Sequence, residues 1–130
     1  MREILFRGKN PVSSEWAYGS LVLEKNAFDE RLILAIISDA DGNETLVNPE
    51  TVGQYTGLKD LHGTRIFEGD VVKSIAAWCV VEFENGGYGL RPFGKGKLIP
   101  IMGHGNFNEN EVEVIGNVFD NPELLEGDKT

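Results

Sequence analysis

The segment Ile66–Arg91, IFEGDVVKSIAAWCVVEFENGGYGLR, decides the fold class of this chain. Its β-branched and aromatic runs predict strands at Val71–Lys73, Trp78–Phe83 and Tyr88–Arg91. The last two strands flank an Asn-Gly pair, a strong signal for a tight hairpin turn because both residues tolerate positive φ. Successive strands joined by a tight hairpin favour an antiparallel sheet, and this order of elements suits an SH3-like barrel.

Outward from this segment, short apolar runs separated by turn residues continue to both ends. The 16 glycines among 130 residues fit many turns between short strands. Asn48-Pro49 and Asn121-Pro122 each place a capping side chain before a proline, as at a helix start. Further strands are predicted at Ile4–Phe6, Trp16–Leu23, Arg31–Ile37 (a buried strand), Thr45–Val47, Leu98–Met102 and Val112–Phe119.

We therefore predict a mainly β fold, a small antiparallel barrel or sandwich that is partly SH3-like, with one or two short helical turns. No linker divides the chain, so a single β-rich domain is expected over residues 1–125, followed by a frayed tail over residues 126–130. In this fold Tyr55, Leu58, Ile66 and Val71 are expected in the core.

Composition limits the classes of function. The formal net charge of −9 disfavours general binding to phosphate backbones. No apolar run reaches the roughly 18 residues of a membrane span, and the N-terminal residues return to charge too soon for a signal peptide, so no membrane association is expected. The single cysteine, Cys79, has no partner in the chain for a disulfide, which fits a reducing, intracellular setting.

Metal-binding patterns are weak. His62, His104 and Cys79 are the only imidazoles and thiol, and no two have the short spacing of zinc ligands. The segment from Asp39 to Glu50 places oxygen side chains as in a calcium loop, at positions 39, 41, 43 and 50. Glu44 stands where such a loop needs glycine, and the flanks are strand-like, so a hairpin turn at residues 39–43 is the favoured interpretation. We predict no metal and no cofactor.

Catalytic patterns are no stronger. Cys79 lies in an apolar run, where a thiol packs as a small hydrophobe. No serine lies in a Gly-x-Ser-x-Gly motif. The carboxylate pairs Glu82/Glu84 and Glu111/Glu113 each share a face of a strand, and that face is expected to be solvated. No catalytic residue is predicted, and the protein is not expected to be an enzyme.

A basic island interrupts the acidic chain between Gly86 and Asn108, with three cations and no acid. Its glycines are expected to expose backbone N–H groups to an anion, and its aromatic rings to stack on the bases of a single strand. A solvated loop is the simpler interpretation of such a charge block. The candidate interaction loop consists of Tyr88, Arg91, Phe93, Lys95 and Lys97.

The run Thr51–Val72, TVGQYTGLKDLHGTRIFEGDVV, closely resembles the signature of the YopX family, small proteins encoded by bacteriophages and prophages. The opening Phe6–Lys9, the segment Trp16–Leu21 and the ending Glu113–Leu125 resemble the family as well. The resemblance implies a β-rich, partly SH3-like fold and no catalytic residue. The signature residues are Tyr55, Thr56, Gly57, Leu58, Asp60, Gly63, Glu68, Gly69 and Asp70.

Most of this signature is expected to maintain the fold, with a ligand or partner surface as the alternative. The leading hypothesis for function is a non-enzymatic accessory protein of phage or prophage origin that acts in the cytoplasm of the bacterial host. It would bind a host or phage protein, or assemble as a homo-oligomer. The alternative is a nucleic-acid-linked role, through the Arg91–Lys97 loop or through an acidic face that mimics DNA.

Overall fold

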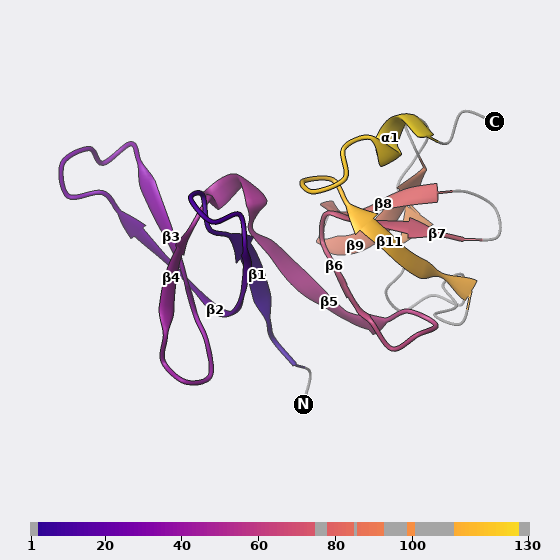
Figure 1. Ribbon diagram of the computed structural model, residues 1–130, viewed down its shortest axis with the longest axis horizontal. Coiled ribbons are helices and arrows are strands. Elements are labelled where there is room, and N and C mark those ends of the chain that lie inside the picture. The colour runs from indigo at the N-terminus through magenta and orange to yellow at the C-terminus, as the bar shows by residue number, and fades with distance from the viewer. Residues whose placement is uncertain (1–2, 75–77, 85, 93–98, 101–110, 128–130) are drawn as a thin grey trace. The chain divides into compact units, whose positions relative to one another are not determined.

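The computed structural model describes residues 3–74, 78–84, 86–92, 99–100 and 111–127. They form two antiparallel sheets with very little helix, which confirms the mainly β prediction (Figure 1). The strands are β1 (Phe6–Lys9), β2 (Trp16–Lys25), β3 (Ile33–Ser38), β4 (Glu44–Val47), β5 (Gly53–Lys59), β6 (Arg65–Phe67), β7 (Asp70–Lys73), β8 (Trp78–Glu84), β9 (Gly87–Pro92), β10 (Ile99–Pro100) and β11 (Glu113–Asn117). The helices are the 3-10 turn η1 (Pro49–Thr51) and α1 (Leu124–Gly127).

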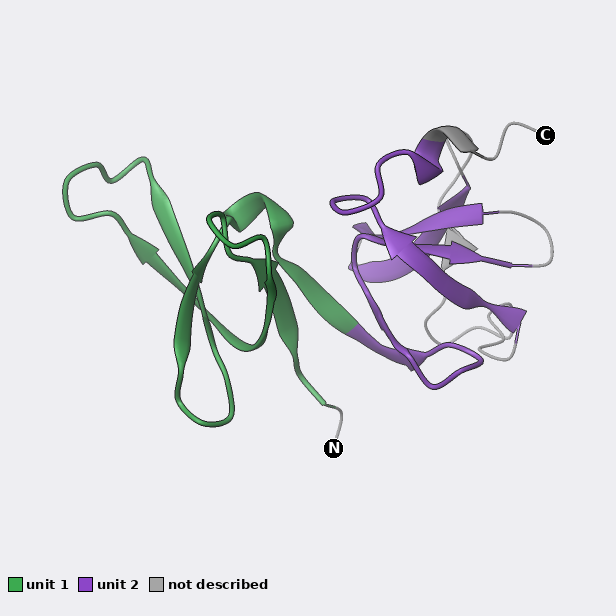
Figure 2. Cartoon of the chain, viewed as in Figure 1, with its two compact units in different colours: residues 1–55 green, residues 56–130 purple. Residues whose placement is uncertain are grey.

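The chain divides into two compact units, residues 1–55 and residues 56–130 (Figure 2). Strand β5 begins in the first unit and ends in the second. The prediction of a single domain over residues 1–125 stays a prediction. The predicted tail starts inside α1, and its last residues, 128–130, lie outside the described part of the chain.

In the first unit, neighbouring strands follow the order β4, β3, β2, β1, β5. Ala35, Ile37 and Val47 form the buried centre of one face, and Phe6 and Leu21 pack against them. Gly19 is required where β2 meets β3, because a Cβ at this position would lie 2.0 Å from the carbonyl oxygen of Ser38. The core of this unit therefore sits on one face of a tightly paired meander.

Strand β1 lies further along the chain than the predicted Ile4–Phe6. It spans Phe6–Lys9, because residues 6–9 pair in register with residues 16–19 of β2. Gly8 does not end the strand. It lies within the strand, where a Cβ would come within 2.7 Å of the Val47 side chain. The glycine thus serves close packing and not a turn.

The two predicted helix starts differ in their detail. Asn48 caps η1 as predicted, since its side chain accepts a hydrogen bond from the Glu50 N–H at 3.0 Å and Pro49 begins the turn. At the second site, the Asn121 side-chain oxygen accepts from the Asn117 N–H at 3.2 Å. Asn121 therefore holds the chain that leads out of β11, and α1 begins only at Leu124.

The second unit contains the other sheet, in the order β10, β9, β8, β7, β11. The hairpin predicted around Asn-Gly is confirmed, with β8 and β9 antiparallel and Glu84 opposite Gly87. Ile66, Val72 and Val81 are fully buried at the centre of its core, and Leu58 packs against them. Cys79 is buried in the same cluster, as its apolar neighbours predicted.

Among the described residues, the strand pairs close neither sheet into a barrel, so the barrel and SH3-like detail stays a prediction. Within the same residues, no helix has the length and apolar character needed to cross a membrane.

Candidate interaction site

The buried carboxylate of Asp60 organises the centre of the family-like signature. Its Oδ1 accepts hydrogen bonds from the N–H groups of His62 and Thr64, both at 2.9 Å. Its Oδ2 accepts from the Val114 N–H of β11, also at 2.9 Å. Burial raises the pKa of this carboxyl group, but the three hydrogen bonds outweigh burial and hold the pKa below its ordinary value of 3.8. Asp60 therefore joins a turn to a strand more than 50 residues away.

The other signature residues also act within the fold. The Thr56 hydroxyl donates to the Ile66 carbonyl at 2.8 Å, which ties β5 to β6. The buried carboxylate of Asp70 accepts from the Phe67 N–H at 2.7 Å across the tight turn between β6 and β7. Gly57, Gly63 and Gly69 all have φ values between 80° and 91°, which favour glycine. Of the remaining signature residues, Tyr55 is buried, whereas Leu58 and Glu68 are half-buried.

His62 lies on the surface beside Glu113 of β11. Its Nε2 is 2.8 Å from Glu113 Oε2, and the two side chains are 59% and 40% exposed. The pair is open to solvent and contains one carboxylate, so it lacks the enclosure of a general acid–base site. No three His, Cys, Asp or Glu side chains gather as metal ligands in the described part of the chain. His104 lies outside that part.

The candidate interaction loop is described only at its beginning. Tyr88 is buried in the core and meets Phe83 edge to face, with ring centroids 5.0 Å apart. The Arg91 guanidinium bonds Glu82 at 3.0 Å and also contacts Glu84. Its hydrogen bond to Glu82 is the main reason that the pKa of Arg91 is raised. Phe93, Lys95 and Lys97 lie outside the described residues, so anion binding by this loop stays a prediction.

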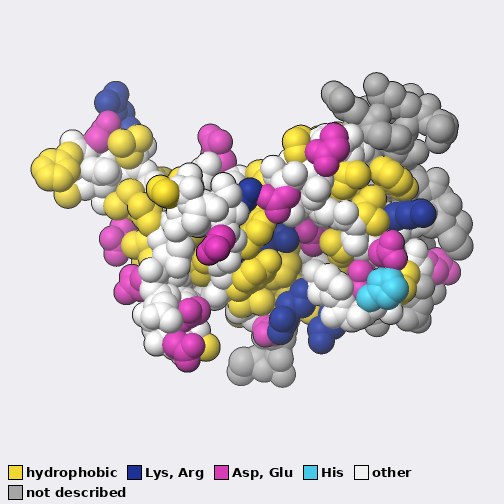
Figure 3. Space-filling view, viewed as in Figure 1, with side chains coloured by type: hydrophobic (Ala, Val, Ile, Leu, Met, Phe, Trp, Pro, Cys, Tyr) yellow, Lys and Arg dark blue, Asp and Glu magenta, His cyan; other side chains and the backbone are white. Residues whose placement is uncertain are grey.

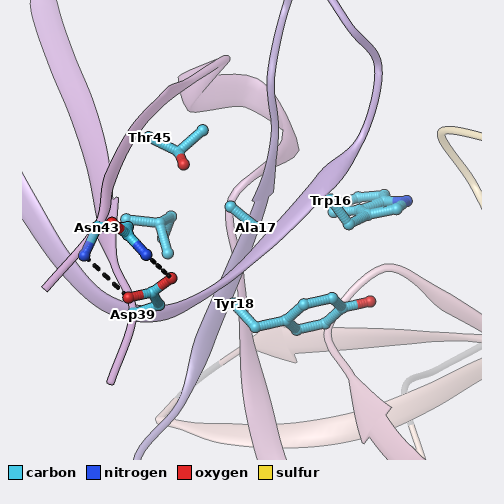
Figure 4. Close-up of a pocket in the computed structure, with 7 residues that line it drawn as sticks. Trp16, Ala17, Tyr18, Asp39, Asn43 and Thr45 are labelled. Carbon is cyan, nitrogen blue, oxygen red and sulfur yellow. Dashed lines mark hydrogen bonds between the residues drawn. The ribbon is translucent and has the colours of Figure 1, made fainter. Parts of the chain in front are cut away.

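A shallow pocket of about 340 Å³ lies beside the turn between β3 and β4. In Figure 4, Trp16 and Tyr18 point away from the polar groups of the turn. The Asp39 carboxylate is engaged within the turn, by the Asn43 N–H at 2.9 Å and the Asp41 N–H at 2.9 Å. The Asn43 hydrogen bond is the largest cause of the lowered pKa of Asp39. The predicted hairpin turn at residues 39–43 is thus confirmed.

The surface feature that the sequence interpretation missed is the second face of strands β2, β3 and β4. Val22, Ile36 and Leu46 lie directly opposite one another across the three strands, on the face opposite to the core. We call these three residues the apolar row. Val22 is 44% and Leu46 51% exposed, while Ile36 is half-buried. An antiparallel sheet with one solvated face normally carries polar residues there.

The β2–β3 hairpin continues beyond the end of β4, because the pairing with β4 stops at Ala35 (Figure 1). Leu23, which pairs with Ala35 at this point, is 59% exposed. Further along the hairpin, Ile33 is 53% exposed and Phe28 at the tip is 99% exposed. Figure 3 shows hydrophobic, acidic and basic side chains together on this hairpin. The predicted buried strand Arg31–Ile37 is therefore wrong in part, since the strand begins at Ile33 and is buried only at Ala35 and Ile37.

A signal for this surface was present in the sequence. Leu21-Val22-Leu23 and the run from Ile33 to Ile37 are apolar at every position, without the alternation of a half-solvated strand. Such runs indicate apolar residues on both faces. They do not indicate whether residues of the same chain cover the second face. The prediction that the whole strand is buried was therefore wrong.

The described residues define a small β protein in which the carboxylates of Asp39, Asp60 and Asp70 hold turns and strands together. The chain belongs to the YopX family, because the family model described as YopX protein matches residues 5–126. The crystal structure of protein EF1440 from Enterococcus faecalis is similar in fold, with a TM-score of 0.57 and 21% sequence identity over 96% of this chain and 99% of that chain. No curated protein matches the chain.

Proposed function

We propose that this YopX-family protein is a non-enzymatic accessory protein of phage or prophage origin, which acts in the bacterial cytoplasm by binding another protein. The observation that carries the proposal is the apolar row on the free face of β2–β4. Val22 and Leu46 keep about half of their surface in contact with water. Covering such side chains would release the free energy of apolar burial, about 25 cal/mol for each Å².

The chemistry of the described residues supports binding over catalysis. The carboxylates of Asp60, Asp39 and Asp70 accept backbone hydrogen bonds that hold turns together. Cys79 is buried in an apolar cluster, where its thiol is inaccessible to a substrate. These contacts tie the groups to the fold, which supports a function carried by the surface.

The nucleic-acid alternative has less support. Arg91, the described cation of the candidate loop, is bonded to Glu82 and Glu84, so its charge is offset at the point where a phosphate would approach. Mimicry of DNA by an acidic face remains an alternative, in which the partner would be a DNA-binding protein.

The test compares variants in affinity capture from a lysate of the host. Val22→Lys combined with Leu46→Lys places two cations in the apolar row, and Val12→Lys is the matched control at a loop residue that is 93% exposed. We expect the wild-type protein and the control to retain the same protein, identified by mass spectrometry, and the double variant to lose it. Thermal unfolding of each variant shows that the fold is intact. Equal retention by the double variant, or a strict monomer that retains nothing, contradicts the proposal.

A further inference from the structure

The apolar row has carboxylates at both ends of its face. The register places Glu24 opposite Leu34 on one side of the row, and Glu44 opposite Ser38 on the other side. Side chains alternate between the faces of a strand, so Glu24, Glu44 and the apolar row all project from the same face. In the described part of the chain, neither carboxylate has an ion pair within 4 Å.

The cations of this face lie elsewhere. Arg7 and Lys9 are on β1, where they pair with Tyr18 and Trp16 of β2. Strand β1 lies on the other side of β2 from β3 and β4. Arg7 lies 4.6 Å and Lys9 5.7 Å from the Trp16 ring centroid, in cation–π geometry. The immediate surroundings of the row are therefore apolar at the centre and negative at two ends.

This charge pattern distinguishes between possible occupants. A second copy of the chain, packed through the same face, would bring its own Glu24 and Glu44 against those of the first copy. Such a copy adds two more carboxylates and brings no cation from beside its own row, so Glu24 and Glu44 of both copies stay uncompensated. A partner that carries Lys or Arg beside apolar side chains satisfies the row and its two ends together.

The spacing of the two carboxylates indicates the form of such a partner. Glu24 and Glu44 lie level with residues 34 and 38 of β3, so they are about 14 Å apart along the strand direction. In an extended segment, residues four apart lie on the same side and are also separated by about 14 Å. On the face the two carboxylates are also two strands apart, about 10 Å across the sheet, so they lie about 17 Å from each other. Two lysines four residues apart, with an apolar residue midway between them, reach both carboxylates through their long flexible side chains.

We propose that the β2–β4 face binds a basic amphipathic segment of another protein, in extended form, with its cations at Glu24 and Glu44 and its apolar side chains on Val22, Ile36 and Leu46. This inference rests on the proposed function and adds the chemical class of the partner. It also gives the acidity of the chain a role in recognition, since a net charge of −9 steers basic partners toward the protein.

Fluorescence anisotropy with synthetic peptides tests the inference on the full-length protein. The probe repeats Lys-Thr-Val-Thr over about ten residues, which puts lysine and valine on one side of an extended chain. One comparison peptide has Ser in place of Val, and a second has Glu in place of Lys. We expect the Lys-Val probe to bind at least about tenfold more tightly than either comparison peptide, with an affinity that falls as salt is raised.

Protein variants locate the binding. Glu24→Gln with Glu44→Gln is expected to weaken the probe about tenfold, as is Val22→Asn with Leu46→Asn. The controls are Glu15→Gln with Glu50→Gln, which make the same charge change at exposed residues outside the face, and Val12→Asn. Both controls are expected to leave affinity within about twofold of the wild type.

Several results would overturn the inference. Equal binding of the Lys-Ser peptide would mean attraction by charge alone, and equal binding of the Glu peptide would exclude the assigned roles of Glu24 and Glu44. A concentration-dependent dimer that Val22→Asn with Leu46→Asn abolishes would identify a second copy as the occupant. If no peptide binds while lysate capture still depends on Val22 and Leu46, the partner class is wrong and the proposed function stands. If capture does not depend on them, the proposed function fails as well.

Discussion

Replacement of Asp60 by asparagine tests whether one carboxylate holds the turn after β5 against β11. Three backbone N–H groups, those of His62, Thr64 and Val114, donate to its two oxygens at 2.9 Å. Asparagine has nearly the same shape, but it replaces one acceptor oxygen with an NH₂ donor and removes the charge. At least one of the three N–H groups then loses its acceptor.

The size of the effect follows from the burial of the donors. Hydrogen bonds to charged groups contribute about 1.5–3 kcal/mol each when they form in protected surroundings. His62 and Thr64 are exposed, so water can replace part of their bonding, whereas Val114 is half-buried in its strand. We expect Asp60→Asn to lower the free energy of unfolding by about 2 kcal/mol and Asp60→Ala by about 3 kcal/mol.

Denaturant unfolding measures this loss, and its dependence on pH identifies the carboxylate as the cause. The pKa of Asp60 is held below 3.8 in the folded protein, so its stabilisation is complete above the pKa of the unfolded chain. It disappears as the pH falls through the folded pKa. The difference in stability between wild type and Asp60→Asn is therefore expected to be constant near neutral pH and to shrink below about pH 4.

Asp41→Asn is the matched control, because Asp41 is an exposed turn residue with an unengaged carboxylate. It is expected to change stability by less than about 0.5 kcal/mol. An Asp60→Asn protein as stable as this control, or one whose deficit persists unchanged into acid, would refute the account of Asp60.

Three further substitutions test individual contacts by thermal or denaturant unfolding. Gly19→Ala forces a Cβ against the Ser38 carbonyl and is expected to cost about 2–3 kcal/mol, whereas a wild-type unfolding midpoint would show that β2 and β3 separate more easily than their packing indicates. Val81→Ala leaves a cavity in a fully buried site and should cost about 2 kcal/mol, so a neutral result would exclude a close-packed second core. Asn48→Ala removes the side-chain oxygen that accepts from the Glu50 N–H and is expected to lower the free energy of unfolding by about 1 kcal/mol. A change near zero would show that this side chain does not cap η1.

Local signals in the sequence predicted much of the β structure. The Asn-Gly pair located the β8–β9 hairpin, and Asn48-Pro49 located η1, because both patterns determine backbone conformation within a few residues. Cys79 was placed correctly in the core because its neighbours are apolar. These features depend on adjacent residues, and the structure agrees with them.

Features that depend on distant pairing were not predictable in the same way. The Val114 N–H that completes the bonding of Asp60 belongs to a strand more than 50 residues later, and no local pattern shows that the two meet. Strand β1 extends past its predicted end at Phe6 because Gly8 packs closely against the side chain of Val47, which is far away in the sequence. For the apolar row, the sequence indicated that β2 and β3 carry apolar residues on both faces. Whether the second face is exposed depends on which other segments pack on it, and the sequence does not show this.

The pairing of β11 with β7 has a consequence for synthesis on the ribosome. Strand β7 ends at Lys73, and the strand that covers its outer edge begins only at Glu113. While the intervening residues emerge, at about 5–20 residues per second, this edge and the Asp60 Oδ2, which accepts from the Val114 N–H, lack their partners for several seconds. A nascent chain stalled within this interval would present the unpaired edge of β7 to other chains. Pairing of β11 with β7 removes this edge and with it the risk of misassembly.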